Sequence, residues 1–252
     1  ISAVNSINWA RLMAQIVYYF FAASQLGAPH RRVAFSVPTG NFGDVFAGYV
    51  AARMGLPIER LIVATNVNDI LHRALSAGDY STGSVTPTAA PSMDIQVSSN
   101  FERLLFDLEG RDGGKTAARM AGFEKSHKML LEPAMRDAAA GIFTSHRVGA
   151  DDMALAMRWA QQHAGQIIDP HSAIGLSAAQ NVDLDPAVPV VTLATAHPAK
   201  FPDAVERATG VRPSLPRRVG DLFDREEKYT KLAGDYDTVK QFITANATPS
   251  DG

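Results

Sequence analysis

The residues best suited to chemistry in this sequence form a short loop, PTGNFGD, at positions 38–44. The loop lies between an apolar, β-rich run at 33–37 and a helical pattern at about 44–54. A strand that turns into a helix in this way leaves backbone N–H groups unpaired at the positive end of the helix dipole. Such a site suits an anion, and a phosphate group above all.

The individual residues of the loop support a phosphate site. Gly40 and Gly43 allow the backbone to approach a ligand and are expected to adopt φ > 0, while Thr39 and Asn41 offer side-chain donors. The loop lacks the Lys-Ser/Thr of a P-loop and the third glycine of a dinucleotide-binding fingerprint. The alternative is a purely structural turn, in which Asp44 is simply a favourable carboxylate in a first helical turn.

Helices and strands alternate on both sides of this loop. Hydrophobic periodicity predicts strands at 33–37, 61–65 and 188–194, and helices at about 7–24, 44–54, 69–77, 100–108, 115–137 and 151–163. Asn5 or Ser6 is expected to cap the first helix. Positions 80–100 are rich in Ser, Thr and Pro and form a loop too long for a simple connection. This order predicts an α/β fold, with a parallel sheet flanked by helices.

Composition narrows the class of protein. The 252 residues are 46% hydrophobic, which suffices for a buried core, and the net charge of -2 argues against nucleic acid as a partner. The longest apolar stretch, 16–23, is far shorter than the roughly 20 residues that cross a bilayer. There is no cysteine, and the seven histidines show no metal-ligand spacing. We expect a cytoplasmic protein that binds no metal, nucleic acid or membrane.

Six motifs occur in the same order as in one known family. They are NSINWAR at 5–11, PTGNFGD at 38–44, ATNVND at 64–69, MDIQVSSNFERLLF at 93–106, DPHSAIG at 169–175 and ATAHPAKF at 194–201. Together they resemble threonine synthase of the bacterial and fungal type, a pyridoxal 5′-phosphate (PLP) enzyme of fold type II, with a tryptophan-synthase-β-like fold. The resemblance implies that 1–220 form most of the PLP-binding large domain and that 221–252 form a charged, helical tail.

The resemblance also implies where the cofactor binds. The 5′-phosphate of PLP would lie on Gly40, Asn41, Phe42, Gly43 and Asp44. Thr195, at the end of the third predicted strand, would meet the pyridine nitrogen, and a neutral hydroxyl there leaves that nitrogen unprotonated. Without the resemblance, Thr195 is equally well explained as a β-favouring residue that closes a strand.

A second set of polar residues is implied to bind the substrate, O-phospho-L-homoserine: Asn5, Ser6, Asn8, Arg11, His171 and Lys200. The start of the first helix is a suitable place for a carboxylate or phosphate group. Each residue also has a structural interpretation. Asn5 or Ser6 would cap the helix, Arg11 and Lys200 would be solvated cations, and His171 would cap or pack at a helix start.

One residue that the family needs is missing from its expected context. PLP enzymes carry the cofactor as a Schiff base on a lysine. The family places that lysine in an N-terminal segment resembling His-Gly-Pro-Thr-x-x-Phe-Lys-Asp, and none of the seven lysines here lies in such a segment. We therefore expect the lysine upstream, no catalytic residue in this chain, open sheet edges and exposed apolar faces, and the N-terminal half of the same enzyme as partner.

The parent reaction implied is the conversion of O-phospho-L-homoserine and water to L-threonine and phosphate, a lyase reaction of threonine biosynthesis, with this chain alone an inactive fragment. Alternatives remain at this point. A dehydratase or sulfhydrylase of the same fold usually lacks the Asn-Phe-Gly-Asp pattern, whereas a threonine-synthase-like phospho-lyase is hard to distinguish. A non-catalytic phosphate-binding, PLP-binding or interaction module would keep the loop and lack the lysine.

Overall fold

The computed structural model describes residues 5–247. The first four and last five residues lie outside the described residues. They belong to the start of the predicted large-domain portion and to the end of the predicted tail. The chain divides into two compact units, Ile1–Pro213 and Ser214–Gly252. The predicted boundary at 220 is close to this division, and the roles assigned to the two portions stay predictions.

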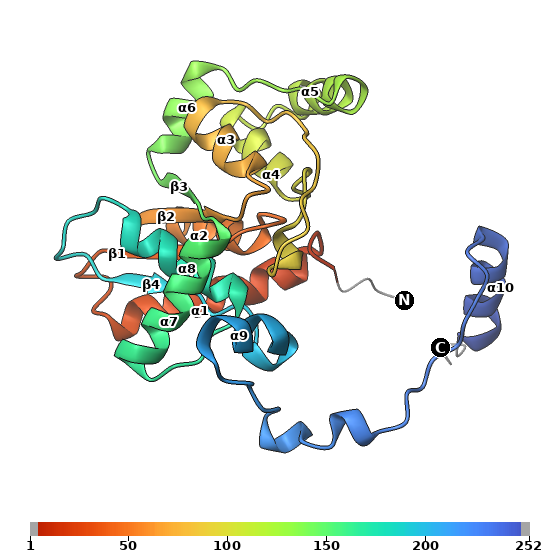
Figure 1. Cartoon of the computed structure of the whole chain (residues 1–252). Helices are drawn as coiled ribbons and strands as arrows, with labels where there is room; N and C mark the ends of the chain where they lie inside the picture. Colours follow the sequence, from red (N-terminus) through yellow and green to blue (C-terminus); the bar gives the residue numbers. More distant parts are fainter. Residues whose placement is uncertain (1–4, 248–252) are drawn as a thin grey trace. The chain divides into compact units, whose positions relative to one another are not determined.

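A four-stranded parallel sheet organises the first unit (Figure 1). Its strands are β1 (Val33–Pro38), β2 (Ile58–Thr65), β3 (Phe143–Arg147) and β4 (Val190–Thr192), in the order β3-β2-β1-β4. The chain runs outward from β1 to β3 and then returns to place β4 on the other side of β1. The order reverses between β1 and β4, which is where parallel α/β sheets bind ligands. The predicted α/β parallel sheet is confirmed.

Helices cover both faces of the sheet because side chains alternate along β1. Phe35 and Val37 belong to the larger core cluster with Tyr19 of α1 (Trp9–Gln25) and Val45 of α2 (Gly43–Arg53). On the other face, the Ser36 hydroxyl donates to the Gly175 carbonyl of α8 (Pro170–Asn181), at 2.6 Å. Helix α7 (Ala150–Ala164) packs on α8. The result is a three-layer arrangement that fixes the carboxyl ends of all four strands.

The remaining helices of the first unit flank this frame. Helices α3 (Ile70–Ala77), α4 (Phe101–Leu108), α5 (Gly113–Ser126) and α6 (Pro133–Ala140) form a group beside β3 (Figure 1). Helix α9 (Pro202–Thr209) packs on α7, and short 3₁₀ turns occupy Pro91–Met93 and Pro198–Lys200. The second unit contains two further 3₁₀ turns, Arg217–Val219 and Leu222–Asp224, and helix α10 (Tyr236–Asn246). No helix in the described part of the chain is long and apolar enough to cross a membrane.

Three local predictions were wrong. Strand β3 was missed because its sequence, FTSHR, is largely polar, which an edge strand with a half-exposed surface tolerates. The single helix predicted at 115–137 is two helices, because His127 adopts a left-handed conformation (φ 55°) that ends α5, and Pro133 then starts α6. Helix α1 is capped by Asn8, whose side chain accepts from the Ala10 N–H at 3.0 Å, and not by Asn5 or Ser6.

Candidate functional site

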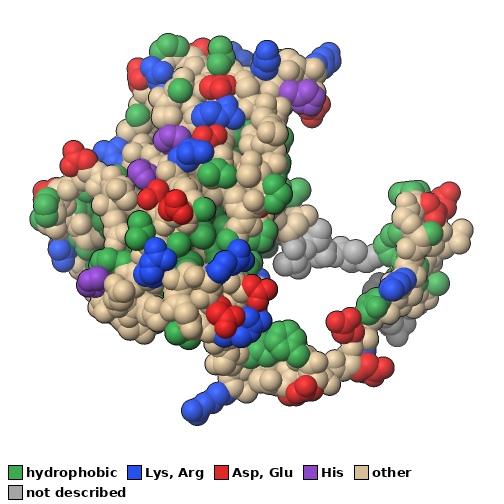
Figure 2. Space-filling model, viewed as in Figure 1, with side chains coloured by type: hydrophobic (Ala, Val, Ile, Leu, Met, Phe, Trp, Pro, Cys, Tyr) green, Lys and Arg blue, Asp and Glu red, His purple; other side chains and the backbone are tan. Residues whose placement is uncertain are grey.

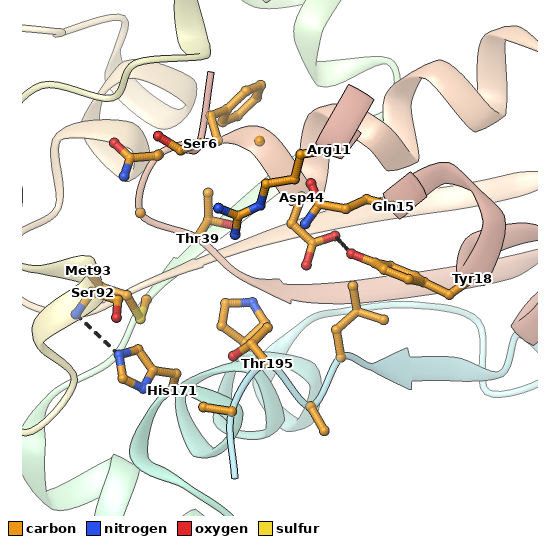
Figure 3. Close-up of a pocket in the computed structure, with 18 of the residues that line it drawn as sticks. Ser6, Arg11, Gln15, Tyr18, Thr39, Asp44, Ser92, Met93, His171 and Thr195 are labelled. Carbon is orange, nitrogen blue, oxygen red and sulfur yellow. Dashed lines mark hydrogen bonds between the residues drawn. The ribbon is translucent and has the colours of Figure 1, made fainter. Parts of the chain in front are cut away.

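A cleft of about 820 Å³ lies at the carboxyl ends of β1 and β4, where the strand order reverses (Figure 3). The loop 38–44 forms its floor, and 193–196 follow β4 along one wall. Helix α1 forms the facing wall, while Ser92 and Met93 close one end. Three loops and two helices, α1 and α8 through its His171, therefore meet at one polar cleft although they are far apart in the sequence.

The backbone carbonyls of loop 38–44 are held by hydrogen bonds from Ser98 and Asn100 on the side away from the cleft. Ser98 Oγ donates to the Gly40 carbonyl at 2.9 Å, and the backbone N–H and Nδ2 of Asn100 donate to the Asn41 carbonyl at 3.1 and 2.9 Å. No acceptor among the described residues is within hydrogen-bond reach of the N–H groups of 40–44. Because the carbonyls are engaged on one side, the N–H groups are left for an anion at the start of α2.

The left-handed residue of this loop is Phe42 (φ 60°), so the prediction that Gly40 and Gly43 take φ > 0 was wrong. Positive φ is costly for an aromatic residue and has to be compensated by its surroundings. The Phe42 ring is almost fully buried, with its centroid 5.3 Å from that of Phe101 and 5.7 Å from that of Phe143. Phe42 therefore offers the cleft its backbone, while its ring anchors the loop in the core.

The two glycines are required for space. A Cβ on Gly40 would lie 2.5 Å from the backbone oxygen of Ser92, and one on Gly43 would lie 3.2 Å from Asn100 Nδ2. Neither the Ser92 backbone nor the clamped Asn100 side chain is free to move away. The loop can therefore approach its neighbours only without side chains at these positions.

Helix α1 contributes a polar stripe that sequence analysis found only in part. Arg11 was predicted, but Gln15 and Tyr18 also line the cleft. The three residues are spaced by four and three positions and so share one helix face, which is the signal that could have identified them. In Figure 3 they extend from α1 toward the loop and Asp44, opposite His171 and Thr195.

The carboxylate of Asp44 is held by two tyrosines. The hydroxyls of Tyr18 and Tyr19 both donate to Asp44 Oδ1, and the Tyr19 hydroxyl also donates to the Asp44 carbonyl at 2.9 Å. Burial raises the pKa of Asp44, although the tyrosine hydrogen bonds and the charge of Arg11 oppose that shift. Asp44 therefore fixes the start of α2 to α1, and its contribution to an anion would come from its N–H group.

A hydrogen-bonded chain connects α8 to both neighbouring walls. Asp169 caps α8 and accepts from the backbone N–H and Nδ1 of His171, both at 2.9 Å, and from the Ser172 hydroxyl. The Ser92 N–H lies 3.3 Å from His171 Nε2 and can only donate, so the ring proton is on Nδ1. Ser172 Oγ accepts from the Thr195 N–H at 3.2 Å.

These hydrogen bonds explain why the Asp169 carboxyl is ionised. Burial by itself would raise the pKa of the Asp169 carboxyl, but the hydrogen bonds from His171 and Ser172 outweigh burial and hold that pKa below its usual value. The charged carboxylate fixes the His171 ring, which also packs on Phe201 at a centroid distance of 4.8 Å. Asp169 itself does not line the cleft and acts through its neighbours.

Ten of the twelve residues predicted to bind cofactor or substrate line this cleft, including Ser6, Arg11, His171, Thr195 and Lys200. Asn5 and Asn8 do not line it; the Asn5 side chain accepts from the Ile7 N–H at 3.2 Å, and Asn8 caps α1. Among the described residues, no acceptor or donor is bonded to the Thr195 hydroxyl. Lys200 is the lysine of the described chain that lines the cleft.

Comparisons with known proteins agree with this geometry. Residues 172–243 match the family model described as threonine synthase, C-terminal. The threonine synthase of Pseudomonas aeruginosa is 54% identical, and that of Corynebacterium glutamicum is 43% identical, each over 96% of this chain and 52% of the relative. A crystal structure of PLP-bound threonine synthase from Brucella melitensis matches with a TM-score of 0.92 and 50% identity, over 97% of this chain and 52% of that one.

The chain matches the C-terminal portion of threonine synthase. It spans about half the length of the curated threonine synthases that it resembles. The family-model match reaches from α8 into α10 and so includes parts of both compact units. The structural match to a threonine synthase also confirms the predicted fold-type II class.

Proposed function

We propose that this cleft binds PLP and serves in the conversion of O-phospho-L-homoserine and water to L-threonine and phosphate. The observation that carries the proposal is the row of backbone N–H groups at 40–44, which have no acceptor among the described residues and face a cleft at the start of α2. Successive amides of this kind bind a phosphate group without any lysine or metal ion. The threonine synthases matched above support the choice of PLP over other phosphate ligands.

The described side chains have distinct roles in this proposal. The amides of 40–44 hold the 5′-phosphate, and the free hydroxyl of Thr195 donates to the pyridine nitrogen. His171 is fixed by Asp169 and provides a neutral wall beside the ring. Arg11 and Lys200 are the cations at the cleft and attract the phosphate and carboxylate groups of the substrate. PLP, when bound, supplies an electron sink for removal of protons from the substrate carbons.

The partner in this proposal is the N-terminal half of the same enzyme, which brings the lysine that carries PLP and also covers α1. Trp9, Met13, Val17 and Phe21 recur every four residues along α1 and are 45–66% exposed. An apolar stripe of that length on a helix is normally buried against another element. The N-terminal half would cover this stripe, and this chain alone would form no threonine.

A chimera tests the proposal. The chain is joined to the N-terminal half of the Pseudomonas aeruginosa relative, and phosphate and threonine are measured after addition of O-phospho-L-homoserine. We expect the chimera to form both products in equal amounts and the chain alone to form neither. Gly40→Ala in the chimera should abolish activity, while Gly83→Ala, whose added methyl would make only ordinary contacts with the Gln96 side chain, the nearest at 3.6 Å, should not.

Two results would overturn the proposal. A chimera that folds, binds PLP and deaminates serine without turning over phosphohomoserine would identify a dehydratase. Full activity of the Gly40→Ala chimera would show that the amides of 40–44 do not hold the cofactor.

A further inference from the structure

A second cavity, of about 700 Å³, lies at the same edge of the sheet, beyond the ends of β2 and β3. Its walls come from 66–67 after β2, from 148–150 after β3, from loop residues 86–89, and from helices α7, α8 and α9. It shares no lining residue with the first cleft. Nothing in the proposed reaction uses it.

The walls of this cavity are mainly aliphatic. Val148 and Ile174 are almost fully buried and belong to one core cluster, and the partly buried Met153 packs against them. Alanines on α7 and α9 leave the space between these side chains open: Ala150, Ala154, Ala204 and Ala208. A pocket of this kind binds an apolar body and uses a few polar groups to orient it.

Two arginines line this cavity, Arg158 of α7 and Arg207 of α9. In the described part of the chain no carboxylate lies within ion-pair distance of either guanidinium. Asp203 and Glu206, the acidic neighbours of Arg207 on α9, are both paired with Arg212 instead, at 2.9 and 2.6 Å. Figure 2 shows basic, acidic and hydrophobic side chains side by side on the face where α7 and α9 lie.

The arginines also keep donors available. Each guanidinium has five N–H donors. Arg158 Nη1 donates one hydrogen bond to the Ala208 carbonyl, at 3.3 Å. This bond holds the Arg158 side chain toward α9. No aspartate or glutamate belongs to the described lining, so a bound ammonium group would find no counter-ion there.

We propose that this cavity is a binding site for a small aliphatic carboxylate. The carboxylate would be held by the guanidinium groups of Arg158 and Arg207. A planar guanidinium can donate two parallel hydrogen bonds to the two oxygens of a carboxylate. The branched or linear carbon chain would lie against Val148, Met153 and Ile174. A simple carboxylic acid should bind better than the amino acid of the same carbon skeleton, because the lining offers the ammonium group no partner.

A ligand here would contact a loop that also reaches the first cleft. Thr88 lines the second cavity, and its N–H and hydroxyl both donate to Asp94, at 2.7 Å each. Asp94 also accepts from Asn66 Nδ2 at 2.7 Å, which ties the loop to the end of β2. Ser92 and Met93, between these anchors, line the first cleft. The two cavities therefore share the segment 86–94 as a common wall.

Each cavity has one methionine in its lining, and the two methionines pack on the same core cluster, so the larger methyl shift locates a ligand. Met153 lies in the second cavity and Met93 in the first, so the methyl resonances of ¹³C-methionine-labelled chain, assigned with Met153→Leu and Met93→Leu, distinguish the sites. The probe is 4-methylpentanoate, with leucine, 4-methylpentanamide and acetate as comparison compounds. We expect 4-methylpentanoate to shift the Met153 methyl saturably and at least about tenfold more tightly than each comparison compound.

Charge-removing variants complete the test. Arg158→Gln and Arg207→Gln should each weaken binding of 4-methylpentanoate at least about tenfold, as expected for loss of a charged hydrogen bond. Arg53→Gln, on an exposed arginine at the end of α2 that lines neither cavity, is the matched control and should leave binding unchanged. The methyl spectrum itself shows that each variant is folded.

Three outcomes would overturn the proposal. The first is the absence of a saturable Met153 shift when 4-methylpentanoate is raised to the concentration at which acetate also shifts that resonance. The second is equal binding of 4-methylpentanoate and 4-methylpentanamide. The third is binding that both arginine variants retain, or that shifts only the Met93 methyl and so belongs to the first cleft.

Discussion

The two cavities occupy the same edge of one parallel sheet but are built in opposite ways. At the ends of β1 and β4, glycines and hydrogen-bonded carbonyls present backbone N–H groups, and polar side chains converge from four other segments. At the ends of β2 and β3, aliphatic side chains and alanines form the walls, and two arginines supply the charge. The first site depends on a fixed backbone, whereas the second depends on two long arginine side chains.

This difference has a consequence for substitutions. A backbone site fails when the loop moves, even if no donor side chain is removed, because its donors are fixed by the surrounding packing. A side-chain site loses only the donor that is replaced. Changes near 38–44 should therefore have larger effects than comparable changes in the second cavity.

Gly40→Ala should have the largest effect. The added methyl would overlap the Ser92 oxygen at 2.5 Å, so the loop has to move and at least two amide contacts to phosphate are lost. At about 1.5 kcal/mol for each charged hydrogen bond, affinity for pyridoxamine 5′-phosphate should fall about a hundredfold. Calorimetric titration measures this loss. Gly83→Ala is the control, and an equal loss in both variants would contradict the comparison.

Asn100→Ala tests the clamp beneath the loop. Asn100 is fully buried, and its Nδ2 donates to the carbonyls of Ser6 and Asn41 at 2.8 and 2.9 Å. Removal takes the side-chain donor from both carbonyls, while the Asn41 carbonyl keeps its bond from the Asn100 N–H. The free energy of unfolding should therefore fall by roughly 1–3 kcal/mol. Urea unfolding measures the change. Ser99→Ala, at the exposed neighbour, should cost less than about 0.5 kcal/mol, and equal effects would show that no clamp exists.

Asp169→Asn tests the charged network of the first cleft through pH. The pKa of Asp169 is depressed in the folded state, so its carboxylate stabilises the fold above the unfolded-state pKa of about 3.9, and this contribution is lost as pH falls through the folded-state pKa. The variant should be about 1–3 kcal/mol less stable at neutral pH. This difference should narrow below about pH 4.

Urea unfolding at several pH values measures this dependence. Asp137→Asn, at an exposed carboxylate of α6 without an ion pair in the described chain, is the control. A stability difference for Asp169→Asn that is the same at pH 3 and pH 7 would show that the charge of Asp169 does not organise α8.

Thr65→Val should have the smallest effect. Thr65 ends β2, is buried, and its hydroxyl has no hydrogen-bond partner among the described residues. Replacing an unsatisfied hydroxyl by a methyl group of the same shape should change stability by about 0–1 kcal/mol, in the stabilising direction. Thermal unfolding compares it with Thr116→Val, which removes a 2.6 Å hydrogen bond to Glu109 and should destabilise. Destabilisation by Thr65→Val would reveal a partner for that hydroxyl.

Runs of apolar residues predicted the strands that are buried on both faces. The runs VAFSV and LIVAT are buried on both faces and were recognisable as strands, whereas the polar FTSHR was not, because its edge position removes the need for apolar side chains. Likewise, Asn8 was grouped with the binding residues because capping and ligand binding favour the same residue types.

The supporting contacts of the site could not be predicted in this way. Ser98 and Asn100 hold a loop 58 and 59 positions away, so only the fold brings them together. Gln15 and Tyr18 follow Arg11 at helical spacing and were accessible to periodicity. The second cavity was not predicted, because its walls come from segments far apart in the sequence that only the fold brings together. Residues 66–67 and Ile174 lie within the quoted motifs ATNVND and DPHSAIG, but nothing in those motifs indicated a cavity.

The most direct test of the central claim is a ¹⁵N–¹H titration of the chain with pyridoxamine 5′-phosphate, which cannot form a Schiff base with a lysine side chain. If the backbone of 40–44 holds the phosphate, the amide protons of Gly40 and Gly43 should move downfield saturably, and pyridoxamine without its phosphate should leave them in place. Saturable binding that leaves the resonances of 40–44 unchanged would contradict the account.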